Sequence, residues 1–204
     1  TTALTNGNDV IITTSDNTGS QAGNIVVNSE IASTATTDRS MRLTAANDIS
    51  INVNITSSNK KLDILLEAEG DVTVADGVNI TTKGGDFTVS GSNTEGDVFA
   101  ARGDEAGSFT FGPTSGTGSG TLSTAGAAGV AGGNITIETA SQNPDGTGAT
   151  DADILINGQL ITSGGTASSS VGLAGGTVSL ETNDSGVITF ASAADVTTTG
   201  SAGN

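Results

Sequence analysis

The chain contains no cysteine, histidine, tryptophan or tyrosine, and only five phenylalanines among its 204 residues. Without histidine and cysteine it can hold no Ser-His-Asp triad, no cysteine nucleophile, no disulfide framework and no zinc, haem or iron–sulfur site built from those ligands. An aromatic content of 2% also argues against stacking platforms for bases or sugars. The remaining chemistry depends on carboxylates, hydroxyls and the backbone.

Positive charge is also scarce, because six Lys and Arg residues stand against 22 Asp and Glu residues. The formal net charge of −16 predicts no nucleic-acid partner and no attraction to an anionic membrane surface. No stretch approaches the ~18 consecutive apolar residues of a membrane helix. We therefore expect no membrane insertion.

Large apolar side chains are few. Leu, Ile, Val and Phe together number 44, whereas Gly, Ser and Thr together number 86. An apolar content of roughly 22% lies near the level at which highly charged chains are disordered. Such a chain can build a core only if its apolar residues recur at positions that stack on one another.

A repeated unit of this kind runs through the chain about six times. Each unit holds a short alternating strand, a polar turn, a second alternating strand, a Gly-centred bend, an apolar residue followed by Thr, and a Gly pair. The second strand recurs in residues 24–31, 48–55, 71–78 and 153–160, and the first in residues 41–43, 62–64, 87–89, 135–137 and 178–180. The units begin near Asp9, Met41, Leu62, Asp86, Asn134 and Thr177.

The units differ in length from about 21 to about 48 residues, and the excess lies in Gly-, Ser- and Thr-rich stretches. Examples are residues 112–120, 143–149 and 164–170, which we predict to be loops added to a constant frame. The pattern leaves open whether residues 86–133 hold one large coil or two small ones.

Alternation with a period of two, β-branched residues and turn residues predict short strands, and no helix is expected. The two all-β arrangements that remain are an antiparallel sandwich and a parallel β-solenoid. The repeat favours a parallel β-helix (β-solenoid) of about six to seven coils of irregular length with loop insertions, forming a single segment over residues 1–204. Stacking at ~4.8 Å would align six side chains in one interior ladder. These are Ile25, Ile49, Val72, Phe109, Ile154 and Val187.

The ends of such a stack need a neighbour, because unpaired strand edges invite association. We see no amphipathic capping helix in the sequence. Residues 198–204 instead resemble the turn at residues 17–24, which leads directly into a strand. The pattern predicts either an internal segment of a longer solenoid or open ends that pair between subunits.

Coils of the form Gly-Gly, alternating strand, Asp-Ile-x-Ile, Gly-x-Leu-x-Thr, Gly-Gly resemble the shafts of filamentous-haemagglutinin-like exoproteins. Gram-negative bacteria secrete that family by the two-partner (type V) route. Residues 43–89 and 132–200 carry most of the likeness. The resemblance implies a right-handed parallel β-helix, secreted to the extracellular cell surface, that serves as an adhesin shaft or fibre.

Three functions remain open. The first is a structural, non-catalytic shaft or fibre whose partners are adjoining coils, further copies, host or neighbouring-cell surfaces, or glycans. The second is a carbohydrate-binding or carbohydrate-processing β-helix, in which acids would converge in a groove. The third is an antiparallel immunoglobulin-like adhesion module. We expect no cofactor, and Ca²⁺ is the one candidate.

Three aspartates that precede second strands, Asp48, Asp71 and Asp153, form the candidate metal site. Stacked one coil apart, they would repel one another unless a cation such as Ca²⁺ bound between them. The Gly-Gly-x-Gly-x-Asp repeat of calcium-binding β-rolls is absent from the sequence. The favoured interpretation is that these carboxylates accept hydrogen bonds from nearby backbone N–H groups.

One tripeptide, Arg102-Gly103-Asp104, resembles the integrin-binding motif and lies in a polar stretch. Three-residue matches arise often by chance, so a solvated loop is the favoured interpretation. Two acidic clusters are the only candidates for catalytic carboxylates, but neither has a basic partner that recurs on a neighbouring coil. They are Glu67, Glu69 and Asp71, and Glu95, Asp97, Asp104 and Glu105 together with Arg102.

Threonines recur where each coil ends, and we expect their hydroxyls to contact the backbone at a corner. They are Thr56, Thr82, Thr124, Thr162 and Thr198.

Overall fold

The computed structural model describes residues 2–14, 23–90, 107–139, 152–167, 171–182 and 186–203. They form one short helix, α1 (Thr2–Thr5), and three six-stranded parallel sheets. The first sheet contains β1 (Val10–Thr13), β4 (Arg39–Ala45), β7 (Leu62–Ala68), β10 (Phe87–Ser90), β13 (Ile135–Thr139) and β16 (Val178–Thr182). The second contains β2 (Ile25–Val27), β5 (Ile49–Ile51), β8 (Val72–Val74), β11 (Phe109–Phe111), β14 (Ile154–Ile156) and β17 (Ile188–Phe190). The third contains β3 (Ile31–Ser33), β6 (Ile55–Ser57), β9 (Asn79–Thr81), β12 (Thr121–Ser123), β15 (Gln159–Ile161) and β18 (Asp195–Thr197).

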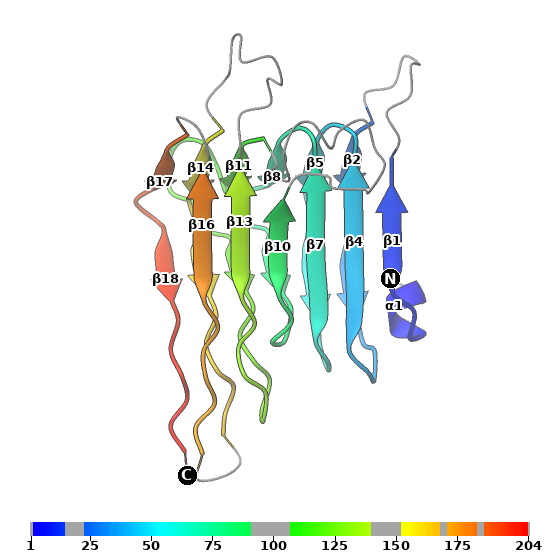
Figure 1. Cartoon of the computed structure of the whole chain (residues 1–204), viewed down its shortest axis with the longest axis vertical. Helices are drawn as coiled ribbons and strands as arrows, with labels where there is room; N and C mark the ends of the chain where they lie inside the picture. Colours follow the sequence, from blue (N-terminus) through cyan, green and yellow to red (C-terminus); the bar gives the residue numbers. More distant parts are fainter. Residues whose placement is uncertain are drawn as a thin grey trace.

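The strands wind into a right-handed parallel β-helix, as predicted. Each strand pairs with the strand three places along the chain, so one coil takes one strand from each sheet. Figure 1 shows the first sheet as one layer, from β1 in blue to β16 in orange. The described residues hold six coils, and the described parts of residues 86–133, namely 86–90 and 107–133, contribute β10, β11 and β12 to one of them. The parallel pairing excludes the antiparallel sandwich.

The interior ladder of the second sheet follows the prediction in five of its six positions. Ile25, Ile49, Val72, Phe109 and Ile154 stack as expected, but the sixth member is Ile188 and not Val187. Val187 is 55% exposed. The error arose because the sixth coil has two adjacent apolar residues where each earlier coil has a polar residue followed by an apolar one, so the pattern did not distinguish the two registers.

The register of the first sheet also differs from the prediction. Met41 pairs with Ile64, and Leu62 pairs with Arg39 two residues earlier. The strands β4 and β7 are seven residues long, longer than the three-residue repeat from which the alignment was made. A shift of two leaves every side chain on its predicted face, so the core is unaffected.

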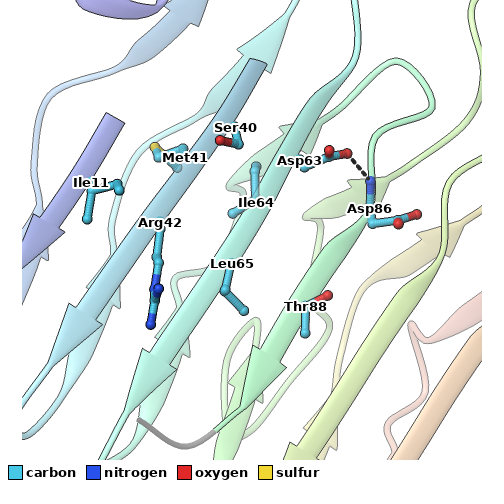
Figure 2. A pocket seen from close by; sticks show the side chains of 9 residues that line it. All are labelled: Ile11, Ser40, Met41, Arg42, Asp63, Ile64, Leu65, Asp86 and Thr88. Atoms are coloured by element: carbon cyan, nitrogen blue, oxygen red, sulfur yellow. Dashed lines mark hydrogen bonds between the residues drawn. The ribbon is translucent and has the colours of Figure 1, made fainter. Parts of the chain in front are cut away.

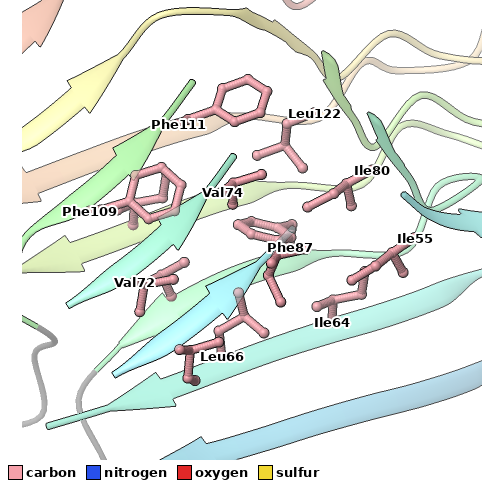
Figure 3. Packing of buried hydrophobic residues seen from close by; sticks show 14 of the residues in the cluster. Ile55, Ile64, Leu66, Val72, Val74, Ile80, Phe87, Phe109, Phe111 and Leu122 are labelled. Atoms are coloured by element: carbon pink, nitrogen blue, oxygen red, sulfur yellow. The ribbon is translucent and has the colours of Figure 1, made fainter. Parts of the chain in front are cut away.

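The core is a narrow column of inward-facing side chains from the three sheets. Figure 3 shows Phe87, Phe109 and Phe111 in contact with aliphatic residues of neighbouring coils, and all three phenylalanines are fully buried. Because one coil encloses so little volume, its apolar residues are covered mainly by the coils before and after it. Few large side chains are therefore enough.

The corner after the third sheet is closed by hydroxyl groups, as expected for Thr82, Thr124 and Thr162. Their Oγ1 atoms donate to the carbonyl oxygens of Gly85, Gly133 and Gly176, at 2.5, 2.7 and 2.9 Å. The three threonines are fully buried. The donor and acceptor are separated by 3, 9 and 14 positions, so one contact closes coils of different length.

The expectation for Thr56 was wrong. Thr56 pairs with Thr81 inside β6 and β9, and the closing position belongs to Ser57, which donates to the carbonyl oxygen of Lys60 at 2.5 Å. Thr198 follows β18 in the last coil and is exposed. The closing residue of the second coil was not predicted because it is Ser57, whereas the predicted pattern required a threonine.

The glycine pairs mark a close approach of backbones at the same corner. A Cβ on Gly133 would lie 2.2 Å from the carbonyl oxygen of Gly85, and one on Gly176 would lie 1.9 Å from that of Gly133. The longer connections also stack, since Gly126 N–H donates to Ser163 O at 2.9 Å and Gly164 N–H to Thr199 O at 2.8 Å. The described part of the predicted 164–170 loop is therefore hydrogen-bonded to neighbouring coils.

The helix α1 corrects the expectation that the chain has neither a helix nor a capping segment. Leu4 of α1 is 1% exposed, belongs to the core cluster, and lies where α1 contacts β3. Four residues are too few to show a helical period in the sequence. Figure 1 shows α1 beside the first coil, so it partly covers the N-terminal end of the stack.

Candidate functional site

The three candidate calcium ligands lie in one ladder that joins the coils. Each precedes a strand of the second sheet, and each Oδ1 atom accepts a hydrogen bond from the equivalent backbone N–H of the next coil. Asp48 accepts from Asp71 at 3.0 Å, Asp71 from Ser108 at 2.9 Å, and Asp153 from Val187 at 2.8 Å. The favoured interpretation of these residues as backbone acceptors is confirmed, with the partner one coil away.

The structure separates the third aspartate from the other two. Ser108 stands between Asp71 and Asp153 in the ladder, and its hydroxyl accepts from Asp153 N–H at 3.3 Å. Among the described residues, no three acids are grouped closely enough to hold a metal ion. Calcium binding stays a prediction, and these contacts do not support it.

A second ladder, which sequence reasoning missed, lies at the starts of strands of the first sheet. Asp63 Oδ1 accepts from Asp86 N–H at 3.0 Å, Asp86 Oδ1 from Asn134 N–H at 2.7 Å, and Asn134 Oδ1 from Thr177 N–H at 3.0 Å. Asp86, Asn134 and Thr177 come directly before β10, β13 and β16, which was the available signal, whereas Asp63 is the second residue of β7. Both ladders supply acceptors at corners where the backbone N–H groups leave the sheet.

A groove of about 470 Å³ lies beside this second ladder, on the outer face of the first sheet. Its floor is a row of outward-facing residues, one from each of β1, β4, β7 and β10 (Figure 2). The lining residues are Ile11, Ser40, Met41, Arg42, Asp63, Ile64, Leu65, Asp86 and Thr88. The groove thus combines an apolar strip with two carboxylates at the strand starts.

The cation in this groove is already paired. Arg42 Nε lies 2.5 Å from Glu67 Oε2, and Thr44 Oγ1 donates to the same oxygen at 2.7 Å. Glu67 is 6% exposed although its side chain points away from the core. Because Glu67 neutralises Arg42, Asp63 and Asp86 leave the groove acidic. It suits a neutral, hydroxyl-rich ligand or a cationic one.

The acidic cluster Glu67, Glu69 and Asp71 is divided by the fold. Glu67 lies in β7 against Arg42, Asp71 lies in the first ladder, and Glu69 lies buried at the corner between them. The three carboxylates therefore do not converge on one substrate position.

The C-terminal coil leaves its interior side chains uncovered. Ile188, Phe190 and Val196 are 38%, 50% and 41% exposed, although they are in register with residues that are fully buried. Those residues are Ile154, Ile156 and Leu160. We call the row Ile188, Phe190 and Val196 the tail row.

The first coil carries a groove of about 490 Å³ at the opposite end of the stack. Its lining includes the inward-facing Ile12, Ile25, Val27 and Ile31, which we call the head row. The head row is only partly covered, with Ile12 at 47% exposure and Ile25 at 7%.

The tripeptide Arg102-Gly103-Asp104 and the cluster Glu95, Asp97, Asp104 and Glu105 lie outside the described residues. Within the described ranges, no helix is both long enough and apolar enough to cross a membrane.

No protein-family model matches the chain, and comparisons with curated proteins and with solved structures find no match either.

Proposed function

We propose that this chain is a structural shaft segment of a secreted, filamentous-haemagglutinin-like bacterial surface protein, whose role is to project or to form a fibre. The supporting observation is the continuous register of all three sheets through six coils. Core columns, aspartate ladders and closing hydroxyls all run along the same axis. Such an arrangement suits the transmission of load along an axis.

The dimensions and charge agree with this role. Six coils at ~4.8 Å each give a rod of about 29 Å, which adjoining coils or further copies extend. The hydrogen bonds between neighbouring coils point along the rod axis. A force applied along this axis is therefore shared by all the hydrogen bonds that join two coils. A net charge of −16 keeps the surface solvated and discourages non-specific adhesion between rods.

The proposed location is the extracellular surface of a Gram-negative bacterium, with loops as the variable face toward host or neighbouring-cell surfaces and glycans. The experiment is immunogold labelling of intact producing cells with antibodies raised against this chain, imaged by electron tomography. We expect label along thin surface fibres, with a periplasmic protein as the control for envelope integrity. Labelling that requires lysis of the cells would overturn the proposal.

A second candidate function, glycan binding, is favoured by the groove on the first sheet. Leu65 and Ile11 offer an apolar strip for a sugar ring, and the Asp63 and Asp86 carboxylates can accept from its hydroxyl groups. Calorimetry with a panel of polysaccharides tests it, with Asp63→Asn and Asp86→Asn as variants. The matched control is Asp153→Asn, which has the same ladder role outside the groove. Binding that survives both groove variants, or no binding at all, removes this candidate.

A further inference from the structure

We infer that two copies of this chain associate head to tail, with the tail row of one copy seated on the head row of the next. The inference names the partner of the open end and rests on the shaft role proposed above only for its biological purpose. The contact itself follows from the two ends of the molecule.

The tail end presents both apolar surface and unpaired backbone. Phe190, Val196 and Ile188 are 50%, 41% and 38% exposed. The strands β16, β17 and β18 are at the edges of their sheets, so one side of each strand has backbone N–H and C=O groups without a strand partner. An edge of this kind is a template for another strand.

The head end presents the complementary edge. The strands β1, β2 and β3 lie at the opposite edges of the same three sheets. Figure 1 shows β1 and β2 at this end of the stack. The groove of about 490 Å³ opens over the head row, and Ile12 is 47% exposed. Each end of the stack therefore exposes inward-facing side chains of the same core.

The registers of the two ends match. Ile188 belongs to the column that begins with Ile25, Phe190 to the column of Val27, and Val196 to the column of Ile31. Leu180 likewise continues the column of Ile12. Moving a copy along the axis by six coils places each tail residue over the head residue of its own column. The occupant that fits every column at once is a second copy.

The size of the contact is adequate for a specific interface. Equivalent residues such as Met41 and Ile64 are 23 positions apart, which at ~3.3 Å per residue gives a perimeter of about 75 Å. With ~5 Å of side chain outside the backbone, the end-on area is roughly 650 Å² on each copy. The total is near the lower limit of specific interfaces. Because the contact joins different surfaces, it generates an open series of oligomers.

Two features weaken the contact. Asp195, the residue before Val196, belongs to the column that begins with Glu30, so stacking of two copies places these two acidic side chains next to each other. Each copy also carries a net charge of −16, so the copies repel one another. In addition, α1 holds Leu4 against β3 and must move aside, which a four-residue helix does easily. We therefore expect association to strengthen with salt, and Asp195→Asn to tighten it roughly fivefold at low salt.

The experiment is sedimentation velocity of the full chain at about 0.05 M and 0.5 M NaCl, up to roughly 1 mM protein. The tail variants are Phe190→Asp and Val196→Asp, and the head variant is Ile12→Asp. Matched controls carry the same substitution on the outward face of the same strand. They are Thr189→Asp beside Phe190 and Ile11→Asp beside Ile12. Circular dichroism checks that each variant is folded.

We expect the wild-type chain and both controls to form a growing series, and each tail or head variant alone to be monomeric. An equimolar mixture of Phe190→Asp and Ile12→Asp should form dimers and stop there, because only one intact head and one intact tail remain to meet. Wild-type protein that stays monomeric in high salt overturns the inference. So does a dimer that survives Ile12→Asp, since that dimer would join two tails. Neither result alters the surface-labelling test of the shaft role.

Discussion

The last coil and the coil before it have equivalent strands in the same register, but their interior side chains have different surroundings. Leu160 is fully buried, whereas Val196, the next residue of the same column, is 41% exposed. Ile156 and Phe190 show the same difference in a second column, and so does Phe111 one coil earlier. A side chain in a solenoid is buried by the coil that follows it as much as by its own position. The same substitution should therefore change the free energy of unfolding by different amounts at different positions along a column.

The largest expected effect is in the phenylalanine column. Phe111→Ala should lower the free energy of unfolding by about 3–5 kcal/mol, because a fully buried ring is removed. Phe190→Ala should cost less than half of that in the monomer, since half of this side chain is already in water. Urea denaturation at low protein concentration measures both. An equal decrease in the free energy of unfolding for both variants would show that the Phe111 and Phe190 side chains are equally buried, which would contradict the comparison.

A glycine at the corner comes next. Gly133→Ala should destabilise the protein by about 2 kcal/mol, because the new Cβ would meet the Gly85 carbonyl oxygen at 2.2 Å and the coils would have to separate. The control at the open end is Gly200→Ala, whose nearest neighbour would be 3.1 Å away. Thermal denaturation should show a clear decrease in Tm only for Gly133→Ala. A wild-type Tm for that variant would contradict the close approach.

We expect a smaller difference in stability between substitutions of the closing threonine in the fifth coil and of its equivalent in the last coil. Thr162→Val keeps the shape of the side chain but leaves the Gly176 carbonyl without its buried donor, at a cost of about 1–2 kcal/mol. Thr198→Val, at the following position of the column, should change stability little because Thr198 is exposed. Chemical denaturation of the two variants, side by side, measures the difference. A loss at Thr198 as large as that at Thr162 would count against the corner contact.

The aspartate ladder should show the smallest effect. Asp71→Ala removes the acceptor of Ser108 N–H and should cost about 1 kcal/mol, while Asp71→Asn keeps an acceptor oxygen and should cost little. Asp153→Ala should cost less than Asp71→Ala, because its partner belongs to the exposed last coil. Thermal melts with CaCl₂ and with a chelator complete the test. A rise in Tm with calcium that Asp71→Asn abolishes would favour the metal site instead.

The fold class could be predicted from the sequence because inward and outward positions alternate in every repeat. The exact register could not be predicted everywhere. A two-residue shift of Leu62 and Ile64 keeps both residues on their faces, and the adjacent Val187 and Ile188 satisfy the pattern equally well. The helix α1 was missed because Leu4 is a single buried residue without a repeat.

The candidate sites were harder to predict than the fold. The aspartate ladder could be expected, since Asp48, Asp71 and Asp153 each come directly before a strand of the second sheet. The groove could not, because Ile11, Leu65 and Asp86 become neighbours only through pairing between coils. The contact of Arg42 with Glu67 likewise joins residues 25 positions apart. The arrangement of outward residues depends on coil length, which the repeat leaves variable.

The closing bond between a buried hydroxyl and a glycine carbonyl makes the corner suitable for grafting. The bond forms with donor and acceptor 3, 9 or 14 positions apart, so its geometry does not depend on the number of residues between them. A foreign peptide of about ten residues inserted between Thr82 and Gly85 would cost only about 1.3 kcal/mol of loop entropy. The molecule is in this respect a display scaffold, on which recognition sequences can be exchanged without redesign of the core.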